Sequence, residues 1–177
     1  PKALEFTGQI GDGWVTIGLD PEHITSGIKI IQQAAKNAGR KLSKIYTTNL
    51  TSGCILRPGE DIMSPRVINQ IGPFAILLLH TAWSPENMGP GPFAPTRFRK
   101  QAEEYFKNHI MEMKTPLEKR FQEMHKGHLT FLQEGEEKYL NPDLIKAATL
   151  TGEPGEVRDR IRQLEDAGVT NIALNVC

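Results

Sequence analysis

The stretch TGEPGEVRDRIRQLEDAGVTNIALNVC, residues 151–177, decides the fold, because it predicts one helix, one turn and one strand. Pro154 suits the first helical turn, where its missing N–H is not needed. Apolar residues recur at helical spacing and predict one buried helix face. They are Val157, Ile161 and Leu164. Gly168 is typical of a helix end. The run from Val169 to Val176 lacks strict alternation, which predicts a strand covered on both faces.

The same helix–glycine–strand unit occurs twice more towards the N-terminus. Residues 3–10 predict a helix that Gly11 ends, and a strand follows at Trp14–Ile17. Residues 24–38 predict a second helix that Gly39 ends, and a strand follows at Lys44–Ser52. Three such units predict parallel strands, adjacent in chain order, with helices outside. That architecture is either a doubly wound sheet or a (β/α)8 barrel.

Three motifs in this order resemble the luciferase-like monooxygenase family. They are Pro1–Phe6 followed by Gly11–Trp14, then Ala38–Arg40, then Gly152–Val157 with Ala167–Val169. The resemblance covers residues 1–56 and 150–177. It implies a (β/α)8 barrel that uses FMN or a deazaflavin coenzyme, acts on a small organic substrate and forms a dimer.

With that resemblance, the expected fold class is α/β, the C-terminal portion of a TIM barrel with three parallel strands and a helical insertion. We expect residues 1–177 to form a single domain, with barrel units at 1–56 and 150–177 and the insertion at 57–149. A barrel needs eight strands, and the chain opens in mid-motif without Met. The missing N-terminal half of the same protein, about 150 residues of a barrel of ~250, is therefore an expected partner.

The insertion should be mainly helical. Ser64 is a predicted N-cap of a helix that extends to His80, with an interruption at Gly72-Pro73. Thr115–Lys126 should form another helix, opened by a capping box. Residues 97–113 and a short segment after Asn141 complete the helical set. Ser84–Pro95 is rich in proline and glycine, which predicts a mobile loop without regular structure and a candidate lid.

Composition excludes several classes of protein. Lys plus Arg and Asp plus Glu both number 21, so the net charge is zero. The chain therefore lacks the excess of positive charge that is typical of nucleic-acid-binding proteins. Cys54 and Cys177 do not make a disulfide framework, which favours a reducing, cytoplasmic location and two buried thiols. We expect no membrane partner, because the longest apolar run is far shorter than a membrane span.

In an α/β barrel the site lies at the C-terminal ends of the strands. Gly18, Asn49 and Asn175 occupy such ends and are expected to line a cofactor pocket. A helix N-terminus binds phosphate readily, and the resemblance implies that the cofactor phosphate sits near Pro1, Lys2 and Ala3. An ordinary solvated N-terminus is the alternative.

Other candidates lie in the insertion. His80 and Trp83 could line a substrate pocket, or could be core-edge residues. His125 and His128 could share a helix face and bind a metal with His109 or Glu112, but we interpret them as solvated and expect no metal. The sequence identifies no catalytic residue.

Three functions therefore stay open. Reduced FMN plus oxygen would make a monooxygenase, and a deazaflavin would make a hydride-transfer dehydrogenase or reductase. A non-catalytic partial-barrel subunit that completes itself by association is the alternative from another class.

Overall fold

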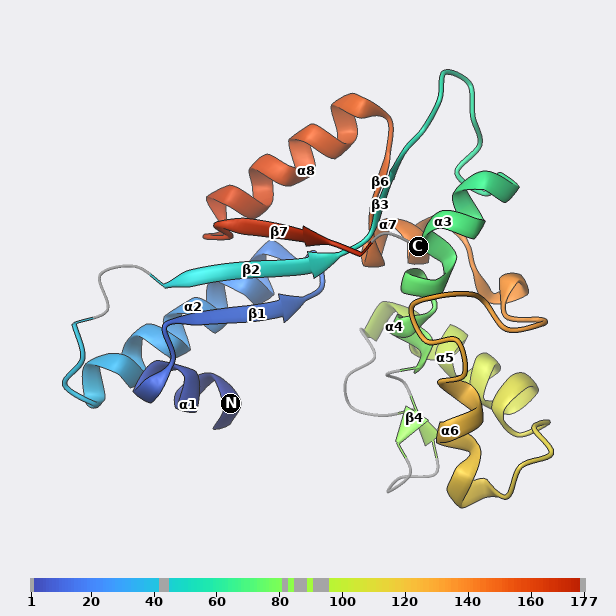
Figure 1. Cartoon of the computed structure of the whole chain (residues 1–177), viewed down its shortest axis with the longest axis horizontal. Helices are drawn as coiled ribbons and strands as arrows, with labels where there is room; N and C mark the ends of the chain where they lie inside the picture. Colours follow the sequence, from blue (N-terminus) through green and yellow to red (C-terminus); the bar gives the residue numbers. More distant parts are fainter. Residues whose placement is uncertain (1, 42–44, 81–82, 85–88, 91–95, 176–177) are drawn as a thin grey trace.

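A computed structural model describes residues 2–41, 45–80, 83–84, 89–90 and 96–175. Its central sheet has three strands, β1 (Gly13–Ile17), β2 (Tyr46–Thr51) and β7 (Asn171–Leu174), in the order β1-β2-β7 (Figure 1). Both pairings are parallel, with Val15 opposite Thr48 and Thr48 opposite Asn171. The predicted three parallel strands, adjacent in chain order, are confirmed.

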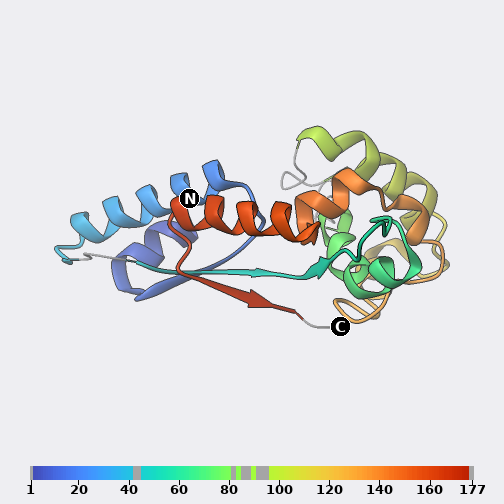
Figure 2. The same cartoon turned by 90° about the horizontal axis from the view of Figure 1, so that it is seen from above.

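Helices cover one face of this sheet. They are α2 (Pro21–Asn37) and α8 (Pro154–Asp166), which lie on the same side of the sheet (Figure 2). A further helix, α1 (Lys2–Ile10), packs against α2 through its buried Gly8. The buried residues of α2 and α8 include Ile24, Val157 and Leu164, which form one apolar cluster with Trp14 at its edge. Ile161, which the sequence placed on the buried face, is 39% exposed. Helical spacing alone therefore assigned Ile161 to the buried face wrongly.

Contacts of Gly8 and Arg40 hold α1 to the rest of this unit. Gly8 allows α1 to approach α2, because a Cβ at Gly8 would lie 2.6 Å from Ala34 Cβ. The Arg40 guanidinium donates to the carbonyl oxygens of Gly8 at 2.8 Å and Gly11 at 2.9 Å. It also lies 3.4 Å from the Asp12 carboxylate. Arg40 therefore satisfies carbonyl groups that the end of α1 leaves without helical partners.

The opposite face of the sheet is open and apolar. Val15 is 67% exposed, Ile17 57% and Tyr46 61%. The prediction that the last strand is covered on both faces is wrong, since Ala173 in β7, which pairs in register with Leu50 on this open face, is exposed. The physical reason is that no described element packs against this face. Because β1 and β7 are the two outer strands, each also keeps one edge without a partner strand among the described residues.

The chain between β2 and α8 forms a second, mainly helical part. It leaves through β3 (Gly53–Ile55) and returns through β6 (Leu150–Gly152), which pairs with β3 in parallel. The helices between them are α3 (Pro65–Ala75), α4 (Leu77–His80), η1 (Thr96–Phe98), α5 (Arg99–Tyr105), η2 (Phe106–Ile110), η3 (Leu117–Lys119), α6 (Arg120–Met124), η4 (Glu137–Tyr139) and α7 (Pro142–Ala148). This part has its own buried cluster, which includes Cys54, Ile71, Tyr105 and Leu144.

Most predicted helix boundaries in this part are confirmed. The Ser64 hydroxyl accepts from the Val67 N–H at 3.4 Å, as an N-cap does. The interruption falls at Ile76, a few residues after Gly72-Pro73, because Pro73 fits within the helix and the turn follows it. The predicted capping box at Thr115 is wrong. The helix starts at Leu117 as a 3-10 turn without a side-chain cap.

The loop predicted without regular structure holds one short exception. β4 (Trp83–Ser84) pairs antiparallel with β5 (Gly89–Pro90). Proline is tolerated there because an edge position needs no N–H donor. The rest of Ser84–Pro95 lies outside the described residues. Among the helices that the structure describes, none is both long and apolar enough to cross a membrane.

Candidate functional site

The three strands of the central sheet end at one rim. β1 is followed by Gly18, β2 by Ser52 and β7 by Asn175. Since the strands are parallel, these residues lie at the same edge, and that edge faces the helical part (Figure 1). Gly18 has φ +103°, and a Cβ there would meet nothing within 4 Å. The end of β1 therefore has open space beside it.

Asn49 lies just beneath this rim and is fully buried. It pairs in register with Thr16 and Ile172, so its side chain points to the helix-covered face. Its Nδ2 donates to the Gly18 carbonyl at 2.6 Å, and its Oδ1 has no hydrogen-bond partner among the described residues. Asn49 therefore holds the turn after β1 in place, and its contact with a cofactor stays a prediction.

Asn175 joins the rim to the helical part. Its backbone N–H donates to the Thr51 carbonyl at 2.7 Å, and its own carbonyl accepts from the Ser52 hydroxyl at 3.1 Å. Its Nδ2 donates to the Leu129 carbonyl at 3.3 Å. The end of β7 is thus connected to the loop that follows α6.

Lys2 and Ala3 begin α1, and both are exposed. Pro1 lies outside the described residues. The first N–H groups of a helix have no partner within the helix, so α1 offers donors to an anion. α1 runs antiparallel to β1, so these donors lie on the side toward which the strands point (Figure 1). The arrangement fits a phosphate group.

A cleft of about 1030 Å³ opens beside Gly18. It is lined by Gly18, Leu19, Asp20, Pro21, Leu78, Arg97, Phe98, Asp143, Lys146, Ala147, Glu156, Arg160 and Gln163. Two of its charged side chains form an ion pair, and a third bonds to the backbone. Lys146 Nζ lies 2.8 Å from Glu156 Oε1, and the Arg160 guanidinium donates to the Thr149 carbonyl at 2.8 Å. Burial, together with the nearby positive charge of Arg97, lowers the pKa of Arg160.

His80, at the end of α4, belongs to a buried polar network around Glu136. His80 Nε2 lies 2.9 Å from Glu136 Oε1, and the Tyr105 hydroxyl donates to the same oxygen at 2.8 Å. The Gln133 N–H donates to Oε2 at 2.8 Å. Burial alone would raise the pKa of Glu136, but the hydrogen bonds from His80, Gln133 and Tyr105 hold that pKa below its usual value. Glu136 is therefore an ionised carboxylate in the interior.

The same network governs Tyr105. Burial, and then the negative charge of Glu136, raise the pKa of the Tyr105 phenol far above its usual value. Its ring stacks on His109, with centroids 5.0 Å apart. Burial lowers the pKa of His109. Tyr105 is thus a permanent hydrogen-bond donor at neutral pH rather than a proton carrier.

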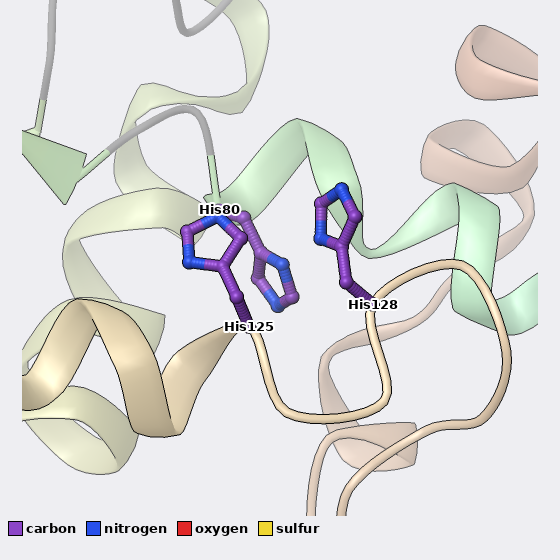
Figure 3. Close-up of side chains that lie close together, drawn as sticks. All are labelled: His80, His125 and His128. Carbon is purple, nitrogen blue, oxygen red and sulfur yellow. The ribbon is translucent and has the colours of Figure 1, made fainter.

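The structure brings His80 together with His125 and His128, which are far from it in the sequence. The rings of His80, His125 and His128 lie side by side, His80 from α4 and the other two from the chain at and after the end of α6 (Figure 3). Centroids are 5.6 Å apart for His80 and His125 and 4.9 Å apart for His125 and His128. Leu129, which follows His128, is the residue that Asn175 contacts at the rim.

Sequence reasoning missed Glu136 and Tyr105. Glu136 lies in the run Glu134–Glu137, where nothing in the spacing distinguishes one carboxylate from its exposed neighbours. Tyr105 lies in a predicted helix but carries no motif. His80 was singled out, and its role in a substrate pocket stays a prediction. The side chain of Trp83 lies outside the described part of the molecule.

Comparisons with known proteins agree with this architecture. The sequence matches the luciferase-like monooxygenase family over residues 1–171. No curated protein matches. One similar solved structure is the coenzyme F420 dependent tetrahydromethanopterin reductase from Methanopyrus kandleri, with TM-score 0.55 and 21% identity, covering 96% of this chain and 40% of the reductase.

A second is an F420-dependent secondary alcohol dehydrogenase in complex with an F420-acetone adduct, with TM-score 0.50 and 15% identity. The match covers 98% of this chain and 40% of the dehydrogenase. These likenesses show the fold, an α/β arrangement of parallel strands and helices. The chain spans about 40% of the length of each of these two proteins. Because the family match extends over almost the whole sequence, the chain belongs to the luciferase-like monooxygenase family.

Proposed function

We propose that this chain is the C-terminal portion of a (β/α)8 barrel and that residues 57–149 are an insertion in a single domain. Two observations support this proposal. Val15, Ile17 and Tyr46 expose an apolar sheet face, which the interior side chains of a closed barrel would cover. The outer strands β1 and β7 also keep edges without partner strands among the described residues, and barrel closure removes such edges.

The complete protein is proposed to be an oxidoreductase that binds a flavin-type cofactor at the rim where the strands end. The observation that carries this proposal is the family match over residues 1–171, together with parallel strands that end at one rim. The bound isoalloxazine or deazaflavin ring would supply hydride or oxygen chemistry. The substrate is proposed to be a small organic molecule.

The residues of this chain would position that cofactor. The N–H groups of Lys2 and Ala3 would donate to its phosphate. Gly18 would leave room for the cofactor beside β1, since a side chain there would point into open space. Asn49 would act through Gly18, whose carbonyl it holds at 2.6 Å.

A deazaflavin is favoured over FMN by one observation. Both solved structures described above are named as F420-dependent. With a deazaflavin the protein would transfer hydride, as a dehydrogenase or reductase. With FMN and oxygen it would be a monooxygenase, as the name of the family suggests.

Titration of the full-length protein with FMN and with coenzyme F420, followed by fluorescence, tests the proposal. We expect saturable binding of one of the two cofactors. Lys2→Ala should weaken binding by about 1–3 kcal/mol if the ammonium contacts phosphate, and should change it little if only the backbone does. Lys29→Ala, an exposed lysine on α2, is the matched control.

The competing proposal is a non-catalytic partial-barrel subunit. The open apolar face of the sheet supports it, because such a face needs a covering partner whether or not a cofactor binds. If neither cofactor binds at high micromolar concentration, the enzyme proposal is rejected and the proposal of a non-catalytic subunit remains. A dimer, or the N-terminal half of the same protein, would be the partner.

A further inference from the structure

We propose that His80, His125 and His128 bind a divalent transition-metal ion of the Zn²⁺ type. One ring nitrogen from each histidine lies within 4.8 Å of the others. Imidazole is the nitrogen ligand that Zn²⁺ prefers, and three histidines with an open fourth position is a known zinc geometry. This site is separate from the proposed cofactor anchor at Lys2 and Ala3 and does not depend on it.

His80 is prepared as a ligand. A carboxylate oxygen only accepts hydrogen bonds, so the 2.9 Å contact with Glu136 places the proton of His80 on Nε2. In the neutral imidazole the other ring nitrogen, Nδ1, then carries the lone pair. It is buried and has no hydrogen-bond partner among the described residues. A buried polar atom without a partner is costly, and a metal ion would satisfy this one.

Many metal-bound histidines donate a hydrogen bond from their second ring nitrogen to a carboxylate, and Glu136 is placed to accept such a bond from His80. It fixes the tautomer and orientation of the ring, as outer partners of metal ligands do. Glu136 is itself held by the Tyr105 hydroxyl at 2.8 Å and by the Gln133 N–H at 2.8 Å. His80 is therefore rigid before any ion arrives.

His125 is prepared in a similar way. Its Nδ1 lies 2.6 Å from the Phe121 carbonyl, which only accepts, so in the neutral ring the proton is on Nδ1 and Nε2 carries the lone pair. His128 adds the third imidazole. Its ring stacks on that of His80, with centroids 6.1 Å apart and planes 27° apart.

The remaining change on binding is small. Zinc–nitrogen bonds of about 2.0–2.1 Å place ligand nitrogens about 3.4 Å apart in a tetrahedron. The nitrogens, now within 4.8 Å of one another, must therefore move closer. His125 and His128 are both exposed, so their side chains can move toward the buried His80. The ion would then fasten the loop after α6 to α4, beside the Leu129 carbonyl that Asn175 contacts.

The test uses full-length protein without a polyhistidine tag, titrated with ZnCl2 by calorimetry and with CoCl2 by visible absorption. We expect one ion per chain and a tetrahedral cobalt spectrum. His125→Ala and His128→Ala should each lower affinity at least tenfold. His23→Ala, which removes an exposed histidine from α2, should change nothing.

Because His125 and His128 are exposed, both variants should keep the wild-type circular dichroism spectrum. The proposal is overturned if the wild-type protein binds no ion. It is also overturned if either histidine variant binds with less than a tenfold loss, or if His23→Ala loses as much affinity as they do.

Discussion

Truncation of Glu136 tests the buried network most directly. Glu136→Ala removes the acceptor of the His80 Nε2–H and the Tyr105 hydroxyl, two donors in buried side chains. Each buried donor left without a partner costs about 1–3 kcal/mol. The two together predict a loss of about 4 kcal/mol in the free energy of unfolding, a large part of the ~5–15 kcal/mol of a typical domain.

Two companion variants separate the hydrogen bonds from the loss of volume. Glu136→Gln keeps the shape and one acceptor oxygen, so it should cost less, about 2 kcal/mol. Tyr105→Phe removes one donor and leaves Glu136 two others, which predicts a loss of about 1–2 kcal/mol. Glu137→Ala, at an exposed neighbouring position, is the control and should stay within about 0.5 kcal/mol of wild type.

Urea unfolding followed by circular dichroism measures each value, with the slope of the transition required to stay constant. The double variant Glu136→Ala/Tyr105→Phe should lose at least about 0.5 kcal/mol less than the sum of the single losses, because both variants break the same contact. The reasoning fails if Glu136→Ala costs less than about 1 kcal/mol. It also fails if the two losses simply add.

Three further predictions concern other parts of the fold. Gly8→Ala places a Cβ 2.6 Å from Ala34 Cβ and should lower the urea midpoint by an amount equivalent to about 1–3 kcal/mol, whereas an unchanged midpoint would contradict the close helix approach. Arg40→Met removes two hydrogen bonds to carbonyls at the end of α1 and should cost about 1–3 kcal/mol by the same assay. The Arg66 guanidinium, hydrogen-bonded to Glu60, lowers the pKa of that carboxyl from 4.5 to about 2. A carboxyl whose pKa is lowered in the folded state stabilises the protein at pH values above its unfolded-state pKa. The difference in free energy of unfolding between wild type and Glu60→Gln should therefore be full above pH 4.5 and disappear as the pH falls toward 2. A difference that does not change with pH would contradict this prediction.

Local signals predicted the sheet well. Gly11, Gly39 and Gly168 marked helix ends, and each strand followed where the spacing placed it. The caps at Ser64 and Asn141 were also found, because an N-cap acts within a few residues along the chain. Such features depend only on residues that are close together in the chain, so a single sequence is enough to predict them.

Contacts between distant segments were not predictable. The sequence offered His109 or Glu112 as partners for His125 and His128, whereas the third ring is His80, the last residue of α4. Likewise, Asn49 was expected to end its strand and line the cofactor pocket, whereas β2 continues to Thr51 and its register places Asn49 on the helix-covered face. Neither fact follows from periodicity, since both depend on how separate elements pack.

The pairing of β3 with β6 has a consequence for the length of the segment between them. Gly53 lies opposite Leu150 and Ile55 opposite Gly152, so the chain leaves and re-enters at adjacent parallel strands. The entropy of closing such a loop grows only with the logarithm of its length, and each doubling costs about 0.6 kcal/mol. A longer or shorter segment between Ile55 and Leu150 should therefore change the free energy of folding only slightly. The β3–β6 pairing would keep both ends of that segment beside the ends of the central strands.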